Sequence, residues 1–164
     1  MNASLSGQYL TFTLDGGAFA LDIATVREVL EMPAITRVPR APRYMRGVIN
    51  LRGNGVPVVD MRRKFGLPDA ERTVNTCIII AEVIHEGASG LLGALVDAVR
   101  EVVEIPASAL LPPPRMGSAV STEYLHAMGK LDSDFVLILD PERVFSLQEL
   151  MVPSSGSEMD DAAA

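Results

Sequence analysis

Short runs in which apolar and polar residues alternate begin the chain and return near its end. Residues 8–14 alternate in this way, stop at the turn signal Asp15-Gly16-Gly17, and resume at residues 18–21. A period of two is typical of strands that have one buried face. Further strands are predicted at residues 76–84, 91–96, 124–131 and 135–139. Many short strands, frequent Gly and Pro turns and only brief helices predict an all-β fold.

Residues 47–60 give the clearest hairpin signal. Two apolar runs flank Asn54-Gly55, the dipeptide that most readily supplies the two positive φ angles of a type I′ turn. The predicted pairs on the mostly apolar face are Gly53 with Val56, Leu51 with Val58 and Ile49 with Asp60; those on the other face are Arg52 with Pro57 and Asn50 with Val59. That second face mixes polar and apolar groups, which suggests that Arg52 is displayed for a partner.

Two parts of the sequence recur in the same order. Residues 26–34 resemble residues 99–107, which lie 73 positions later. A second set recurs 80 positions later: Val56, Val58, Asp60 and Phe65 become Val136, Ile138, Asp140 and Phe145. Two ordered matches at similar offsets indicate a duplicated unit with one loop insertion. Each half is too small for a sandwich but adequate for a five-stranded barrel.

The remaining segments are read from their flanking residues. Residues 91–105 could line one side of a helix, but Gly93 and the β-branched Val residues favour strands. A short helical turn is predicted to lead into a strand after Ile23, and residues 107–114 are predicted to be irregular. Asp60 and Asp140 are placed to cap short helices, the second with Val144, Leu147 and Met151 on one face and Pro153 as its stop.

The predicted domain covers residues 8–150, between a flexible N-terminus (1–7) and a flexible acidic tail (151–164). Barrel one is expected mainly in residues 8–68 and barrel two mainly in residues 76–150, with exchange of strands between them left open. The tail has no role that the sequence assigns.

Basic residues are concentrated in one segment of the chain, although the net charge of the whole chain is −7. Eight of the fourteen lie between positions 37 and 64, where Asp60 is the only acid: Arg37, Arg40, Arg43, Arg46, Arg52, Arg62, Arg63 and Lys64. One interpretation is a docking face for a protein. The alternative is a small-barrel nucleic-acid-binding protein that uses the segment from Arg37 to Lys64, although this segment offers only Tyr44 as a base-stacking platform.

Catalytic and metal chemistry find little support. Cys77 is the single cysteine and His85 and His126 are the only histidines, which excludes a disulfide framework and nearly excludes a Cys/His zinc site. There is no phosphate-binding loop and no nucleophile elbow. We therefore expect no enzyme activity, no catalytic or metal-binding residues and no cofactor. Without a secretory signal or an apolar run of membrane-spanning length, we expect a cytoplasmic protein that does not insert into the membrane.

One long motif resembles a known family. It comprises residues 46–53 (RGVINLRG), residues 56–62 (VPVVDMR) and Phe65-Gly66, and the similarity in layout runs from about Gln8 to Leu150. These residues resemble the CheW family, the adaptors that couple chemoreceptors to the histidine kinase CheA. The resemblance implies two packed SH3-like barrels and two partners, the regulatory domain of CheA and the cytoplasmic tip of methyl-accepting chemoreceptors.

The resemblance also implies partner-binding positions. Gly47, Asn50, Arg52 and Gly53 lie on the signature hairpin, and Arg52 would bring charge-assisted contacts to carboxylates or carbonyls. Val26, Glu28 and Val99 match the family's partner-contacting region. Backbone geometry is the competing explanation for the two glycines, and core packing for the two valines. The resemblance further implies recruitment to membrane receptor arrays.

Overall fold

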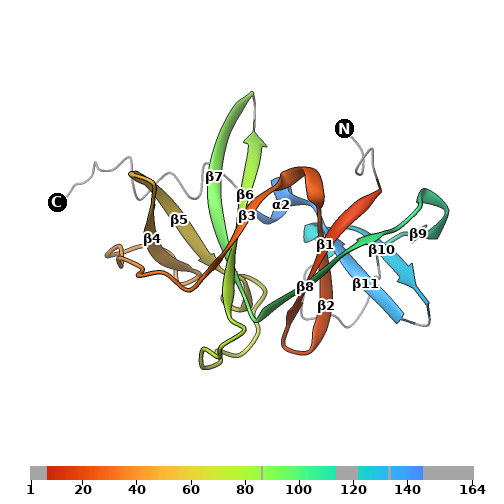
Figure 1. Cartoon of the computed structure of the whole chain (residues 1–164), viewed down its shortest axis with the longest axis horizontal. Helices are drawn as coiled ribbons and strands as arrows, with labels where there is room; N and C mark the ends of the chain where they lie inside the picture. The colour runs from red at the N-terminus through yellow and green to blue at the C-terminus, as the bar shows by residue number, and fades with distance from the viewer. Residues whose placement is uncertain (1–6, 86, 114–121, 133, 146–164) are drawn as a thin grey trace.

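The computed structural model describes residues 7–85, 87–113, 122–132 and 134–145, and this part of the chain is built almost entirely from two β-sheets (Figure 1). Sheet A contains, in spatial order, β8 (Ala98–Glu104), β1 (Gln8–Leu14), β2 (Gly17–Asp22), β11 (Asp134–Leu139), β10 (Leu125–Leu131) and β9 (Leu110–Leu111). Sheet B contains β3 (Val26–Glu31), β6 (Cys77–His85), β7 (Ala88–Val96), β5 (Asn54–Asp60) and β4 (Met45–Leu51). The predicted all-β class is confirmed.

The described chain also contains five short helical turns, four between strands and one after the last strand. They are η1 (Ile23–Thr25), α1 (Met61–Lys64), η2 (Ala107–Ala109), η3 (Thr122–Tyr124) and α2 (Pro141–Val144). The predicted caps of α1 and α2 are confirmed, since Asp60 accepts a hydrogen bond from the Arg63 amide and Asp140 accepts one from the Glu142 amide. The predicted continuation of the second helix through Leu147 and Met151 lies outside the described residues, as do the expected flexible segments 1–6 and 151–164.

Each sheet combines strands from both halves of the chain. Sheet A combines the first two strands of the chain with its last four, whereas sheet B uses a continuous stretch from β3 to β7. The exchange arises because β1 and β2, which pair with each other, join sheet A through the pairing of β1 with β8 and the parallel pairing of β2 with β11. Sheet B still takes three of its five strands from residues 8–68, and sheet A takes four of its six from residues 76–150, so strands are exchanged in the way that the sequence left open.

The predicted duplication is visible in the strand pairing. The hairpins β4–β5 and β10–β11 share one register 80 positions apart: Met45 with Val59 and Gly47 with Val58, then Leu125 with Leu139 and Ala127 with Ile138. Both hairpins also carry the same bulge between the first and second of these pairs. The amides of Asp60 and Asp140 then donate to the carbonyls of Tyr44 and Tyr124, again 80 positions apart.

Each sheet curls toward closure because one segment touches both of its edges. In sheet B, β3 pairs with β6 at one edge, and the same segment continues to Thr36, which pairs with Val48 of β4 at the other edge. In sheet A, the chain leaves β8 through η2 and reaches β9, which pairs with β10 at the opposite edge. This is the closure expected of small barrels.

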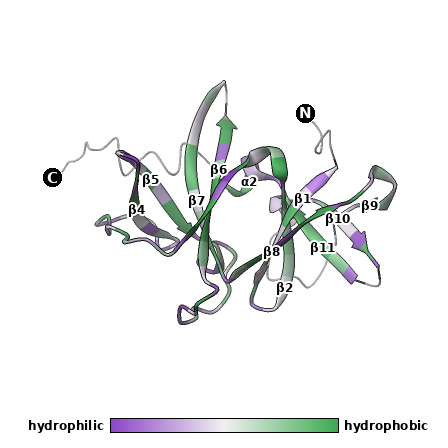
Figure 2. Ribbon diagram, viewed as in Figure 1, coloured by the Kyte–Doolittle hydropathy of each residue, from purple (hydrophilic) through white to green (hydrophobic). Residues whose placement is uncertain are grey.

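Three apolar clusters follow from this arrangement. Sheet B encloses one with Ile49, Val56, Ile78 and Ile80, and sheet A encloses another with Tyr9, Ile105 and Val136. A third, here called the shared core, draws residues from both sheets, among them Phe12, Phe19, Met61, Ile79 and Phe145. Alternate residues of β6 therefore face different cores, which explains its unbroken apolar run, and Figure 2 shows β6 and β7 as predominantly hydrophobic.

Candidate functional site

The signature hairpin turns two residues earlier than predicted. Leu51 pairs with Asn54, so Arg52 and Gly53 are the central turn residues, with φ angles of 50° and 88°. Two positive φ angles are the mark of a type I′ turn. Asn54 and Gly55 instead begin β5, and the predicted pairs, from Gly53 with Val56 to Asn50 with Val59, are wrong.

Side-chain packing explains why the hairpin adopts this register and not the predicted one. Moving the turn by two residues changes the partner of Ile49 by four positions, from Asp60 to Val56, and leaves the side chains on their predicted faces. Ile49 and Val56 both lie in the core of sheet B. The Asn50 side chain then stabilises the turn, because its Oδ1 accepts a hydrogen bond of 2.7 Å from the Gly53 amide. Asn50 and Gly53 thus set the backbone that carries Arg52.

Arg52 and Glu28, which were proposed separately from the sequence, lie together. The Arg52 guanidinium donates to the Glu28 carboxylate at 2.5 Å, while 69% of the Arg52 side chain stays exposed. Glu28 shares a face of β3 with Leu30, which packs against the core of sheet B. The hydrogen bond from Arg52 lowers the pKa of Glu28, and the same bond raises the pKa of Arg52. The result is a fixed, exposed ion pair.

Two exposed apolar residues at the same end of sheet B were missed in the sequence. Strand β5 runs parallel to β7, so the Arg52 turn and the β6–β7 tip lie at one end of the sheet, and Figure 1 shows both tips on the same side. Ile84 is 54% exposed and Leu91 is 36% exposed. Both lie on the face that carries Ile80 deeper in the sheet. We call Arg52, Glu28, Ile84 and Leu91 the hairpin end.

A second ion pair borders the hairpin end. Arg27 of β3 pairs with Glu82 of β6, and Glu82 lies directly opposite Leu91 on β7. Ile84 could have been found from β6 alone, because the inward alternation of this strand continues through Glu82 to Ile84 beyond the buried isoleucines.

Gly47 lies away from the hairpin end and serves the backbone. Its φ is 148°, and a Cβ built there would come within 2.1 Å of the Thr36 carbonyl oxygen. Thr36 and Val48 exchange two hydrogen bonds of 2.8 Å beside it. Gly47 therefore permits the contact that closes sheet B, and backbone geometry accounts for a glycine at this position.

Val26 and Val99 are half-buried and pack against the shared core. They begin equivalent edge strands, β3 and β8, whose later residues Val29 and Val102 are 42% and 50% exposed. On each strand, the face that packs on the shared core at the first valine is exposed to solvent at the second. We call these four residues the valine strip. It relates to the sequence repeat, because Val26 and Val29 match Val99 and Val102.

Most of the basic segment is neutralised by ion pairs with Asp60, inside the segment, and with acids from other parts of the chain. Five of its eight basic residues form ion pairs: Arg43 and Arg63 with Asp69, Arg46 with Asp60, Arg52 with Glu28, and Arg62 with Asp97. Lys64 lies 4.2 Å from the Tyr44 ring, so the one predicted stacking platform is already occupied by a cation. This arrangement does not favour the nucleic-acid alternative.

Metal and membrane sites find no support in the described part of the chain. No group of three or more His, Cys, Asp or Glu side chains there is arranged to hold a metal ion. Within the same residues, none of the helices has the length and apolar character needed to span a bilayer.

Comparison with known proteins points to one family. Residues 8–149 match the model of the CheW-like domain. The chain is 31% identical over 143 residues to the chemotaxis protein CheW of Klebsiella aerogenes, covering 87% of this chain and 84% of that protein. It is 26% identical over 143 residues to the chemotaxis protein CheW of Treponema pallidum, covering 87% of this chain and 84% of that protein.

A solved structure agrees in both fold and sequence. The crystal structure of the scaffolding protein TtCheW from Thermoanaerobacter tengcongensis superimposes with a TM-score of 0.78 at 30% identity, covering 88% of this chain and 96% of that one. The pairing, the repeat and these matches agree. The chain belongs to the CheW-like family of chemotaxis scaffold proteins.

Proposed function

We propose that this chain is a non-enzymatic coupling protein that bridges methyl-accepting chemoreceptors and the histidine kinase CheA in arrays at the membrane. The observation that carries the proposal is the hairpin end, where an exposed arginine is held by Glu28 beside two exposed apolar residues. Such a surface offers binding energy without any catalytic group.

The hairpin end has the composition of a docking site. Ile84 and Leu91 would supply an apolar centre, and the Arg52–Glu28 and Arg27–Glu82 pairs would form a polar rim. Arg52 carries five N–H donors on a planar group, which suits carboxylates and carbonyl oxygens of a partner. Glu28 holds the guanidinium in one place, so less entropy is lost on binding.

Bridging needs a second surface, and the valine strip supplies a candidate. Val29 and Val102 expose apolar area on two equivalent edge strands whose buried neighbours belong to the shared core. A partner that covers this strip would leave the hairpin end free for another. An adaptor that holds both partners at once raises their local concentration, and a change in receptor state is then coupled to the kinase by binding free energy.

The test is a charge swap. Arg52→Glu removes the ion pair and reverses the displayed charge, while Arg52→Glu combined with Glu28→Arg restores an ion pair with its polarity inverted. Binding to a receptor cytoplasmic fragment and to the CheA regulatory domain is measured separately by calorimetry. We expect Arg52→Glu to weaken one of the two by about 10-fold or more, and the double variant to remain weak.

The matched control is Arg143→Glu on α2, the short helix that follows β11, because the Arg143 side chain is 63% exposed. It should bind both partners as the unchanged protein does. Recovery of binding in the double variant would show that only the internal pair matters. Unchanged affinity of Arg52→Glu for both partners would remove the hairpin end from the proposal.

A further inference from the structure

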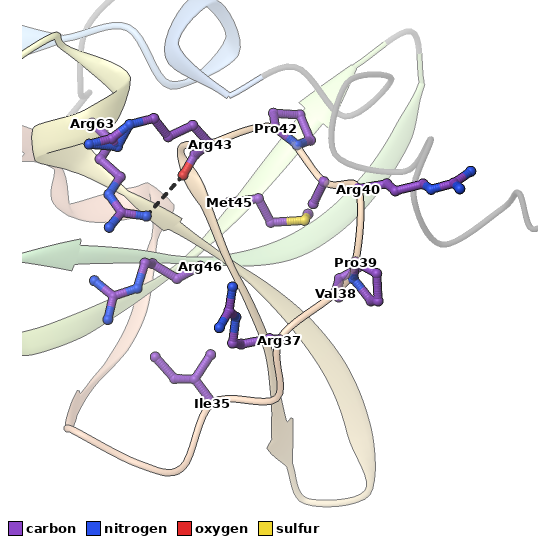
Figure 3. Close-up of a pocket in the computed structure, with 11 residues that line it drawn as sticks. Ile35, Arg37, Val38, Pro39, Arg40, Pro42, Arg43, Met45, Arg46 and Arg63 are labelled. Carbon is purple, nitrogen blue, oxygen red and sulfur yellow. Dashed lines mark hydrogen bonds between the residues drawn. The ribbon is translucent and has the colours of Figure 1, made fainter.

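The loop that precedes β4 encloses a basic cavity. Its volume is about 810 Å³, and five arginines line it: Arg37, Arg40 and Arg43 from the loop, Arg46 from β4 and Arg63 from α1. No acidic residue is part of the lining. Figure 3 shows Arg37, Arg46 and Arg63 on one side of the cavity and Arg40 at its outer rim. We call these five residues the arginine loop.

The charges of the arginine loop are only partly compensated. Arg43, Arg46 and Arg63 share two carboxylates, those of Asp60 and Asp69. Among the described residues, neither Arg37 nor Arg40 has an ion pair or a hydrogen bond from its side chain. Arg40 also has a φ of 64°, in the left-handed region. The cavity therefore presents the uncompensated positive charges of Arg37 and Arg40.

The end of the described chain lies close to this loop. The Asp140 amide at the start of α2 donates to the Tyr124 carbonyl. Lys64 lies between Tyr124 and Tyr44, with its Nζ 5.5 Å from the centre of the Tyr124 ring and 4.2 Å from the centre of the Tyr44 ring. Tyr44 lies between Arg43 and Arg46 of the arginine loop in the sequence. Phe145, where the described chain ends, belongs to the shared core together with Phe65, the residue that follows Lys64.

The segment after Phe145 carries a cluster of carboxylates. Glu158, Asp160 and Asp161 lie 13 to 16 positions after Phe145, and no basic residue occurs beyond Arg143. Thirteen residues reach at most about 45 Å, so the cluster can reach the cavity from its anchor. We propose that residues 158–161 dock in the cavity of the arginine loop, where their carboxylates pair with Arg37 and Arg40.

The strength of this contact follows from its chemistry. Exposed ion pairs contribute little each and are screened by salt. Because residues 158–161 belong to the same chain as the cavity, their carboxylates have an effective concentration in the millimolar range, which compensates for the weakness of each ion pair. The docked segment is therefore populated at low salt and released at high salt. It would occupy the most basic surface of an otherwise acidic protein.

Paramagnetic relaxation enhancement tests the proposal on the full chain. A nitroxide is attached at Ser157→Cys, while Cys77 stays unlabelled because it is 8% exposed and burial raises the pKa of its thiol. At about 50 mM NaCl we expect the amide signals of residues 37–46 to broaden selectively. The broadening should fall at about 500 mM NaCl and in the triple variant Glu158→Gln, Asp160→Asn, Asp161→Asn.

Matched variants locate the site. Arg37→Gln with Arg40→Gln should abolish the selective broadening, whereas Arg100→Gln with Arg143→Gln, two exposed arginines outside the cavity, should leave it unchanged. Broadening that only decreases with distance from Phe145, or that ignores the neutralised carboxylates, overturns the proposal. So does equal broadening when ¹⁵N-labelled protein is mixed with a spin-labelled second copy, because the contact would then be intermolecular.

The experiment needs neither receptor nor kinase. Its failure leaves the coupling function untouched, and loss of the coupling function leaves the docking of residues 158–161 untouched.

Discussion

Gly47→Ala should strongly destabilise the protein even though Gly47 lies on the signature hairpin. The added methyl group would lie 2.1 Å from the Thr36 carbonyl oxygen and 2.8 Å from a methyl group of Ile35. Thr36 can move away only by breaking its two hydrogen bonds with Val48. The substitution therefore opens the seam that closes sheet B.

The magnitude can be worked from these contacts. Two backbone hydrogen bonds contribute about 0.5–1.5 kcal/mol each, and holding an L-residue in the conformation of Gly47 costs about 1–3 kcal/mol. We expect the free energy of unfolding to fall by about 3 kcal/mol. Gly53→Ala is the matched control, because Gly53 also has a positive φ but no atom lies within 4 Å of its built Cβ. That variant should lose only about 1 kcal/mol.

Urea unfolding, followed by circular dichroism, separates the two variants. With a slope of about 2 kcal/mol per molar urea, the midpoint should fall by about 1.5 M for Gly47→Ala and by about 0.5 M for Gly53→Ala. Equal midpoints for the two variants would refute the closure argument. If Gly47→Ala then bound a partner more weakly while fully folded, Gly47 would be a docking residue instead.

Two further substitutions test the geometry by urea unfolding. Asp97→Asn should cost about 2 kcal/mol at pH 7, because Asp97 accepts two hydrogen bonds from Arg62 and one from the Asp15 amide. Burial alone would raise the Asp97 pKa, but these bonds outweigh it and lower the pKa. The difference in unfolding free energy between Asp97→Asn and the unchanged protein should therefore hold above about pH 4 and vanish as the pH falls through the lowered Asp97 pKa. A difference that stays constant with pH would contradict the stabilising role of the Asp97 carboxylate. Asn50→Ala should cost about 1 kcal/mol by removing the bond to Gly53, and an unchanged midpoint would show that the turn needs no such support.

Local chemistry was enough to predict the elements but not every register. The strands, the capped helices and the repeat follow from alternation, turn residues and Asp caps. The position of the turn in the signature hairpin could not be predicted in this way, because two candidate I′ sites two residues apart present the same side chains to the core. The choice is made by contacts such as Ile49 with Val56 and by the parallel pairing of Val58 with Gly93.

In the candidate site, too, several residues could be found from the sequence, whereas their contacts depend on the fold. Arg52, Asn50 and Gly53 could be found from one continuous motif, and Glu28 from the family resemblance, but their ion pair depends on how sheet B curls. Ile84 and Leu91 were missed because their exposure depends on which strands stop short of the β6–β7 tip. The division of strands between the sheets was also beyond local patterns, since β2 and β11 are more than 100 residues apart.

The pairing of β2 with β11 also governs how the protein is made. Sheet B is contiguous in the chain and can form as soon as its strands leave the ribosome, whereas β2 must wait for the chain to extend from Asp22 to Leu139. At about 5–20 residues per second, that interval of roughly 117 residues lasts about 6–23 s. Throughout it, the β1–β2 hairpin carries a bare strand edge, which is the feature through which nascent chains aggregate. Slow translation of the second half would prolong this exposure, so the yield of folded protein depends on elongation speed.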